Sequence, residues 1–371
     1  MKILCICPIG IGNYIMCYSA FYAIKKNMPN ASLNLLALRH SIKEIAYNDA
    51  LWDEVIAFDP DKIKKDFRNI LSSILTIIKI KFDVSLCFFP SNSWQYNFLP
   101  FLCRIKKRYA FRYKLKRIKS LSFLNTKRIN IDINSHDIFQ NLKLAEFFLN
   151  KQISKEEIVF PCLYKEEHKR WAIEYLSSIK TTNKIFIAVH PGSSLEHGME
   201  AKRWPPDNFA CLLDYICEFL SADALIFGSK DESEIKSAVF SKMKKRAHII
   251  EPVDISKTAA LISHCFCCIA NDSGIMHIAA SMNIPTCGIF GPTDEKRNGP
   301  YGKNNIVVRK KMNGFPLWTA ENVGERFVPN GVDPKKSLNE LSSDEAWIQI
   351  KPWLEKLLAE KNIINYKKIE Q

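Results

Sequence analysis

The sequence predicts an α/β protein built from two doubly wound parallel sheets, one in each half of the chain. Three observations predict this fold class. Short apolar runs alternate with longer amphipathic stretches in both halves, which is the pattern of strands interleaved with helices. Polar, glycine-containing loops follow several of these runs, as they do at the carboxyl edge of such sheets. The length of 371 residues is enough for two domains, each with its own core.

The first half of the chain contains an alternating series of predicted strands and helices. They are KILCIC (2–7), residues 14–26, LNLLAL (33–38), SIKEIAYN (41–48), DEVIAFD (53–59) and FDVSLCFF (82–89). The pattern fades over a basic segment and resumes with the amphipathic helix DIFQNLKLAEFFL (137–149).

A second series starts after a break near residues 161–166 and a helix at 166–179. Its predicted strands are KIFIAVH (184–190), DALIFG (223–228), HIIEP (248–252), CFCCIAN (265–271) and PTCGIFG (285–291). The helices between them lie at 206–220, 231–243, 255–264 and 274–282, and a final amphipathic helix covers 342–361.

The composition indicates an ordinary globular protein, with 47% hydrophobic and 25% charged residues. We read no signal peptide at the start of the chain and no apolar window of the roughly 18 residues that span a bilayer. Most of the 12 cysteines lie in apolar segments, such as those of Cys5, Cys87 and Cys267. Because the CFCC segment lacks the spacing of a zinc site, we expect buried, reduced thiols and no metal site.

The net charge of +14 is unevenly distributed along the chain. Between Arg104 and Arg128 there are eleven Lys and Arg residues and no Asp or Glu. Such a segment attracts polyanions, namely nucleic acid, acidic phospholipid or a phosphorylated glycan, but it is also compatible with a solvated basic face. Composition alone leaves both interpretations open.

The first loop, PIGIGN, follows the first predicted strand and contains Gly10, Gly12 and Asn13. A dinucleotide-binding loop needs a third glycine where the chain has Ile15, and an acidic residue about 20 positions later, where the second strand ends without one. A Walker lysine is also missing. The loop is therefore interpreted as a tight glycine turn that exposes backbone at the edge of the sheet.

Two loops in the second half carry more chemistry. The strand ending at His190 leads into Pro191, Gly192, Ser193 and Ser194, and Lys202 follows before the next helix. Hydroxyls and a lysine in a glycine-containing loop suit diphosphate oxygens. The alternative is a surface loop with a solvated lysine.

The second of these loops is NDSG, which starts a helix after the strand CFCCIAN. Asp272, Ser273 and Gly274 lie at the helix start, where free N–H groups and the helix dipole favour a phosphate, and His277 lies one turn further on. Asp272 alone is equally compatible with a helix cap. A third loop, Gly291–Asp294, follows the next strand. The convergence of three loops at one sheet edge predicts a nucleotide-diphosphate site.

These motifs resemble glycosyltransferase family 9, the bacterial lipopolysaccharide heptosyltransferases. The resemblance rests on HPGSS…KRWPPDNFA, NDSGIMHIAAS and FGPTDE…GPYG in the second half, and on KILCICPIGIGNYIM and WDEVIAFD in the first. It implies a GT-B fold, in which two Rossmann-like doubly wound domains face each other across a cleft. The implied domains are an acceptor-binding domain at 1–162, a nucleotide-sugar-binding domain at 163–340, and a C-terminal helix at 341–371 that returns to the N-terminal domain.

The resemblance also implies a reaction. This is the inverting, metal-independent transfer of a heptose, or a related sugar, from ADP-heptose or a similar nucleotide sugar to a lipopolysaccharide-core or other glycan acceptor, without a cofactor. The implied partners are the nucleotide sugar, a phosphorylated glycolipid or glycan acceptor and the inner leaflet of the membrane, rather than nucleic acid. The implied location is the cytoplasm, peripheral on the inner face of the inner membrane.

The site residues follow from the matching motifs. The donor side would comprise Ser193, Ser194 and Lys202 at the diphosphate, Asp272, Ser273, Gly274 and His277 at the sugar and phosphates, and Glu232 near the nucleoside. Lys202 and Asp272 would also serve catalysis. The acceptor side would comprise Gly10, Gly12, Asn13 and the basic residues Arg104, Lys106, Lys107, Arg108 and Arg112.

Asn13 departs from the family pattern, which has Asp directly after the last glycine of the opening loop as the candidate catalytic base. An amide does not usefully accept a proton at neutral pH. The base then comes from elsewhere, with Asp137, His136 and His40 as candidates, or Asn13 only orients a hydroxyl of a different substrate. The remaining alternatives are a non-catalytic protein that binds a nucleotide sugar or a polyanion, and a nucleotide-sugar epimerase of the same fold.

Overall fold

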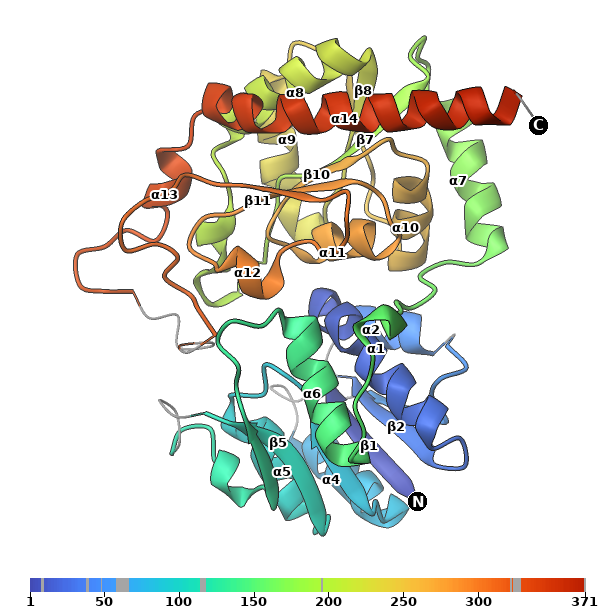
Figure 1. The fold of residues 1–371 in the computed structure, drawn as a ribbon, viewed down its shortest axis with the longest axis vertical. Helices are drawn as coiled ribbons and strands as arrows, with labels where there is room; N and C mark the ends of the chain where they lie inside the picture. The colour runs from blue at the N-terminus through green and yellow to red at the C-terminus, as the bar shows by residue number, and fades with distance from the viewer. Residues whose placement is uncertain are drawn as a thin grey trace. The chain divides into compact units, whose positions relative to one another are not determined.

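A computed structural model of the chain describes residues 1–7, 10–37, 40–47, 49–57, 67–113, 118–194, 196–320, 322 and 328–369. It divides into two units, which we describe separately. The first contains Met1–Leu163 with Lys296–Asn298 and a segment beginning at Trp318, and the second contains most of the remaining chain from Tyr164 onward (Figure 1).

The first unit is a six-stranded parallel sheet with helices on its faces. Its elements are β1 (Lys2–Cys7), α1 (Ile11–Asn27), β2 (Ser32–Ala37), α2 (His40–Ala46), β3 (Glu54–Ala57), α4 (Phe67–Ile80), β4 (Val84–Cys87), α5 (Trp94–Leu102), β5 (Lys107–Arg112), η1 (Ser122–Leu124), β6 (Lys127–Asn130), α6 (Asp137–Leu149) and η2 (Lys155–Glu157). The strand order is β3-β2-β1-β4-β5-β6, the order of a Rossmann fold.

The second unit repeats this topology. Its elements are α7 (Glu166–Ser178), β7 (Ile185–His190), η3 (Glu196–Lys202), α8 (Pro206–Leu220), β8 (Ala222–Ile226), η4 (Lys230–Glu232), α9 (Ser233–Lys242), β9 (Ala247–Ile249), α10 (Ile255–Ser263), β10 (Cys268–Asn271), α11 (Gly274–Ser281), β11 (Thr286–Ile289), α12 (Glu295–Asn298), β12 (Ile306–Val308), α13 (Lys336–Asn339) and α14 (Ser343–Ile369). The strand order β12-β11-β10-β7-β8-β9 is the same Rossmann order read from the other side. The predicted pair of doubly wound sheets is therefore confirmed.

The central strands are buried along almost their whole length, as parallel strands covered on both faces must be. In β1 every residue after Lys2 is buried, and all four residues of β10 are buried. This explains why both segments read as continuous apolar runs. The twelve cysteines are all free thiols and ten of them are buried, which confirms the expectation for the sulfur-rich strands.

Two strands lie where the sequence pattern fades. β5 and β6 fall within the basic segment and pair with each other in parallel, Tyr109 with Lys127 and Arg112 with Asn130. β6 forms the edge of the sheet and has no fully buried residue. Lysines and arginines on an edge strand remove the apolar signal and also oppose pairing with other chains.

The last helix, α14, packs within the second unit along the part whose side chains the structure describes, and its return to the N-terminal domain stays a prediction. The side chains of Ala346, Ile350, Trp353, Leu354 and Leu357 on α14 belong to the core of the second unit, together with Trp204 and residues of α8. This helix therefore packs on the sheet that precedes it in the chain, because its apolar face completes that core. No helix among the described residues is long and apolar enough to cross a membrane.

Candidate functional site

The predicted donor-site residues lie at the switch point of the second sheet. β7 and β10 are adjacent parallel strands there, with Ala270 paired to His190 at their carboxyl ends. The loop after β7 and the loop after β10 therefore leave the same edge side by side. Ligands of open α/β sheets bind at this kind of position, because the two loops diverge and leave room between them.

Lys202 and Asp272 form the central pair of this site. The Lys202 Nζ lies 2.7 Å from the Asp272 Oδ2, and the two side chains are 16% and 4% exposed. Burial works to raise the pKa of the Asp272 carboxyl, but the Lys202 ammonium, with smaller contributions from His277 and Thr293, lowers it below its ordinary value. The pair is thus a fixed positive charge held in place by a buried carboxylate.

The start of α11 lies next to this pair. Its N-cap residue, Ser273, makes no side-chain hydrogen bond to the helix backbone. The Ser273 hydroxyl instead lies 2.9 Å from the Nδ1 of His190. Because no side chain caps them, the first N–H groups of α11 suit an anion, and the helix dipole favours negative charge at the same point.

Glu232 lies on the other side of His190. Its Oε2 is 3.3 Å from the His190 Nε2 and accepts a hydrogen bond of 2.8 Å from the Ser229 N–H. Burial opposes ionisation, but His190 and Ser229 outweigh it and lower the pKa of Glu232 to about 2. Glu232 is therefore an ionised carboxylate in a fixed position, suited to accept hydrogen bonds from nucleoside hydroxyls.

Gly192 makes the approach of Glu232 possible. A Cβ placed on Gly192 would lie 2.1 Å from the Glu232 Oε1, which is far inside contact distance. We expect Gly192→Ala to displace Glu232 and to lower nucleotide affinity about tenfold or more, because the carboxylate loses its contacts to His190 and Ser229. Titration calorimetry with ADP checks this. The control is Gly10→Ala, because its added Cβ meets nothing within 4 Å, whereas Gly198 is unsuitable because its φ of +80° strains any other residue. Unchanged ADP binding in Gly192→Ala would contradict the assignment.

Ser193 and Arg203 make hydrogen bonds inside the loop that follows β7. The Ser193 hydroxyl is buried and donates to the Met199 carbonyl at 2.9 Å. The Arg203 guanidinium donates to the Ser193 carbonyl and lies 3.8 Å from Glu232. The Ser193 hydroxyl thus closes its own loop rather than pointing outward, whereas Ser194 is exposed.

The other donor-side predictions lie on or near α11. His277 is buried, 6% exposed, one turn after Gly274. In the third loop, Gly291 is in close contact with Leu338, since an added Cβ would lie 2.6 Å from the Leu338 Cγ. This gives Gly291 a packing role.

Two residues of this site, His190 and Arg203, have no role in the sequence-based prediction. His190 joins Ser273 to Glu232, and Arg203 joins Ser193 to Glu232. The signal for His190 was its place as the polar last residue of a buried strand. Across the part of the chain that the structure describes, no group of three or more His, Cys, Asp or Glu side chains is placed to hold a metal ion.

In the first unit, Gly10 and Asn13 lie at the start of α1. Gly10 is the N-cap residue, and its carbonyl accepts a hydrogen bond of 3.1 Å from the Asn13 N–H. Asn13 is half-buried and Gly12 is buried in the first turn. Pro8 and Ile9 of this loop lie outside the described residues, as does the side chain of His40.

The two other candidate bases are occupied by structural contacts. His136 is the N-cap residue of α6, and its Nδ1 accepts the Ile138 N–H at 3.2 Å. Asp137 is 1% exposed, and the Arg297 Nε lies 3.7 Å from its carboxylate. His136 is half-buried and Asp137 is buried, and each side chain already has a structural contact.

The basic residues of the acceptor-side prediction are divided between two edges of the first sheet. Lys107 is paired with Val84 at the amino ends of β5 and β4, and Arg104 and Lys106 precede it. These three therefore lie at the edge opposite to the one where β1 ends and Gly10 follows, whereas Arg112 ends β5 at the same edge as Gly10. Arg108 is tied to the backbone, since its Nε and Nη2 donate to the Leu124 carbonyl at 3.0 and 2.7 Å.

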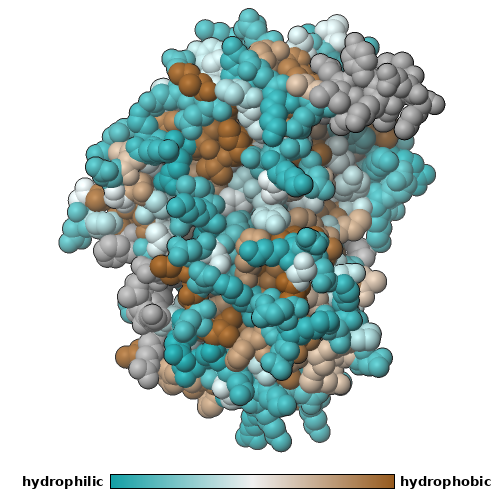
Figure 2. Space-filling view, viewed as in Figure 1, coloured by the Kyte–Doolittle hydropathy of each residue, from teal (hydrophilic) through white to brown (hydrophobic). Residues whose placement is uncertain are grey.

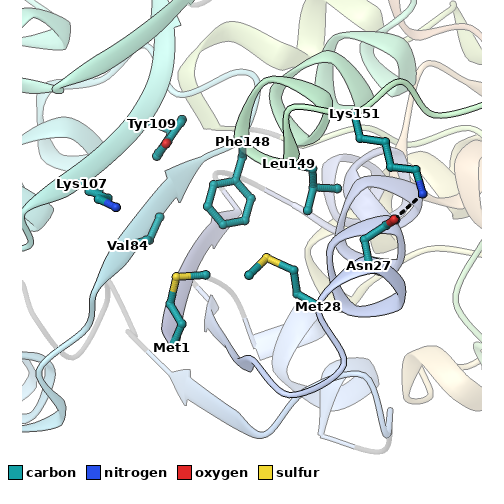
Figure 3. A pocket seen from close by; sticks show the side chains of 9 residues that line it. All are labelled: Met1, Asn27, Met28, Val84, Lys107, Tyr109, Phe148, Leu149 and Lys151. Atoms are coloured by element: carbon teal, nitrogen blue, oxygen red, sulfur yellow. Dashed lines mark hydrogen bonds between the residues drawn. The ribbon is translucent and has the colours of Figure 1, made fainter.

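A cavity of about 470 Å³ lies at the amino edge of the first sheet, away from these loops (Figure 3). Figure 3 shows Lys107 and Lys151 near its rim and apolar side chains between them, with Lys151 donating to the Asn27 Oδ1 at 2.7 Å. It is lined by Met1, Asn27, Met28, Val84, Lys107, Tyr109, Phe148, Leu149 and Lys151. It contains none of the predicted donor residues.

The family model and the curated relatives agree on one family. The model of glycosyltransferase family 9 (heptosyltransferase) matches residues 79–323. Lipooligosaccharide heptosyltransferase 2 of Haemophilus ducreyi is 26% identical over 331 residues, covering 83% of this chain and 88% of that protein. Among solved structures, a family 9 glycosyl transferase of Veillonella parvula has a TM-score of 0.77 at 19% identity, covering 96% and 97% of the two chains. The E. coli ADP-heptose lps heptosyltransferase II has a TM-score of 0.70 at 19% identity, covering 97% and 100%.

Proposed function

Since the chain belongs to glycosyltransferase family 9, the heptosyltransferase family, we propose that it transfers a heptose, or a closely related sugar, from ADP-heptose to a lipopolysaccharide-core or similar glycan acceptor. The chain shares the GT-B fold with the two solved structures named above. The observation that carries the proposal is the Lys202–Asp272 pair beside the uncapped start of α11. A sugar donor of this class has a diphosphate leaving group, and these groups supply the charge it needs.

The proposed reaction is a single displacement with inversion. The acceptor oxygen forms a bond to the anomeric carbon while the bond from that carbon to the diphosphate oxygen breaks, and its electron pair leaves with ADP. The Lys202 ammonium and the α11 N–H groups stabilise the charge that develops on the diphosphate, without a metal ion or cofactor. The proton of the acceptor hydroxyl is taken up by a base or by solvent.

The donor-binding groups have separate roles in this proposal. Lys202 and the start of α11 bind the diphosphate, while Glu232 accepts hydrogen bonds from the nucleoside. His190 positions Glu232 and Ser273 relative to each other. On the acceptor side, Gly10, Gly12 and Asn13 contact the reacting hydroxyl, and Arg112 lies at the same sheet edge.

We also propose that the enzyme works in the cytoplasm, at the inner face of the inner membrane. The reason is the acceptor: a lipopolysaccharide core is attached to a lipid, and it is presented at a membrane surface. The net charge of +14 favours an anionic surface of this kind.

A donor panel tests the proposed function. We expect ADP-heptose to raise the Tm more than UDP-, GDP- or dTDP-sugars at the same concentration, because the ligand with the lowest Kd stabilises the native state most. A ligand at about 100 times its Kd stabilises it by about 2.7 kcal/mol. Release of ADP should then require a glycan acceptor. Turnover of the donor without any acceptor would indicate an epimerase, and a protein that no nucleotide sugar stabilises would be a polyanion-binding protein instead.

A further inference from the structure

The first unit has a surface whose chemistry the transfer reaction does not use. It lies at the amino edge of the sheet, where α4 and α5 end. Its apolar side chains are those of Leu75, Ile78, Phe101 and Leu102, which are 46%, 38%, 45% and 40% exposed. Its cations are Lys79, Lys81, Arg104 and Lys106, all exposed. We call these eight residues the amino-edge surface.

The sheet brings the two helix ends together. α4 leads into β4 and α5 leads into β5, and these neighbouring strands pair at their starts, Val84 with Lys107. Both helices pack on the same face of the sheet, because Ile77 of α4 and Leu99 of α5 contact one apolar cluster. The outward side chains of both helix ends therefore occupy one edge.

The part of the sequence that carries this surface is strongly basic. Between residues 67 and 131 the sequence contains fourteen Lys and Arg residues and a single acidic residue, Asp83. Asp83 is engaged, since its carboxylate accepts the backbone N–H of Lys2 at 2.8 Å. None of the four cations of the amino-edge surface forms a salt bridge with another residue that the structure describes.

Two of these cations occupy unfavourable backbone positions. Lys81 and Arg104 end their helices with φ angles of 58° and 55°, a left-handed conformation that glycine adopts without cost. The chain thus has a cation at both positions where glycine would be the more stable choice. The uncharged residues Leu121 and Ser221 adopt the same conformation, so Lys81 and Arg104 are positions where the charge can be removed without a backbone penalty.

We propose that the amino-edge surface binds the anionic surface of a lipid bilayer. Large apolar side chains enter the boundary between headgroups and acyl chains, and the surrounding lysines and arginines attract anionic headgroups. The large apolar side chains distinguish this surface from a nucleic-acid site, which is read mainly through phosphate contacts. Figure 2 shows hydrophobic side chains interspersed with hydrophilic ones over one face of the first unit, in the lower half of the view.

This inference rests on the proposed location at the inner membrane, names the surface that makes the contact, and is independent of the transfer chemistry. It separates membrane contact, at the amino edge of the first sheet, from the predicted acceptor loop with Gly10 and Asn13, at the carboxyl edge. Vesicle binding is measured without donor or acceptor, so its failure and the failure of the proposed reaction are distinguishable.

Sedimentation with phosphatidylcholine vesicles, with and without phosphatidylglycerol, tests the proposal. We expect the full chain to bind only the vesicles with phosphatidylglycerol, and less as salt is added. The double variant Lys81→Gly/Arg104→Gly should bind at least about tenfold more weakly, since each cation near an anionic surface contributes about fivefold. The same variant should be as stable as the parent or more stable, because glycine relieves both backbone positions.

Matched variants separate this surface from general effects. Ser221→Gly relieves a φ of 50° at the end of α8 and should leave vesicle binding unchanged. Leu75→Ser/Phe101→Ser should weaken binding about tenfold, whereas Ile173→Ser/Phe240→Ser, at exposed positions of the second unit, should not. Equal binding of the parent and the Lys81→Gly/Arg104→Gly variant would overturn the proposal, as would salt-sensitive binding to DNA without binding to vesicles.

Discussion

Lys202→Ala is expected to lower kcat/KM for sugar transfer by at least about 10²-fold, which is the cost of removing one preorganised group that stabilises a developing negative charge. The Lys202 Nζ is fixed 2.7 Å from a buried carboxylate. Its positive charge is thus already in place before the diphosphate leaves. Donor affinity should fall as well, because the same charge contacts the diphosphate in the ground state. Steady-state kinetics and titration calorimetry with ADP-heptose measure both effects.

Loss of Lys202 also removes the main cation facing the buried Asp272 carboxylate, which destabilises the fold although His277 and Thr293 remain nearby. The double variant Lys202→Met/Asp272→Asn removes both charges and should recover stability while transfer stays low. Lys242→Ala is the matched control, since the Lys242 Nζ forms an exposed pair with Asp207 in the same unit, and we expect it to behave like the parent. Wild-type donor binding in Lys202→Ala would show that the diphosphate binds elsewhere.

The fold was predictable from the sequence where strands are buried on both faces. β1 and β10 are almost entirely buried, and β7 is buried over its last four residues. Each therefore appears as an apolar run, and the polar loops mark where these strands end. β5 and β6 could not be found in this way, because their exposed positions hold lysines and arginines. The position of α14 was also not predictable, because an amphipathic helix does not indicate which core its apolar face completes.

The candidate site was predictable where one loop carries several polar residues. Ser193, Lys202, Asp272 and Ser273 all lie at the carboxyl ends of β7 and β10, as the motifs indicate. The contacts of His190 were not predictable from the sequence, because its partners Ser273 and Glu232 are 83 and 42 residues away in the chain. Only the strand order, with β7 between β8 and β10, brings these three side chains together.

Asn13→Asp is expected to raise the rate of transfer by about 10²-fold or more, the usual contribution of a positioned general base. Asn13 is half-buried in the first turn of α1, at the edge where β1 ends. A carboxylate there interacts favourably with the helix dipole and should stabilise the protein by about 0.3–1 kcal/mol. The fold is therefore expected to tolerate the substitution, and single-turnover kinetics with saturating ADP-heptose measures its effect on the chemical step.

The pH dependence distinguishes a new base from a general effect of charge. In the parent, which has an amide at this position, the rate should rise with pH because the acceptor hydroxyl loses its proton to solvent. An aspartate near a helix N-terminus has a pKa below its usual value of about 3.9. The Asn13→Asp variant should therefore show a flat profile above about pH 5 and its largest advantage at low pH. Asn134→Asp adds the same charge to an exposed site of the same unit and should leave rate and profile unchanged. If Asn13→Asp matches the parent at every pH, the hydroxyl is not deprotonated at this position, and Asn13 serves to orient the acceptor.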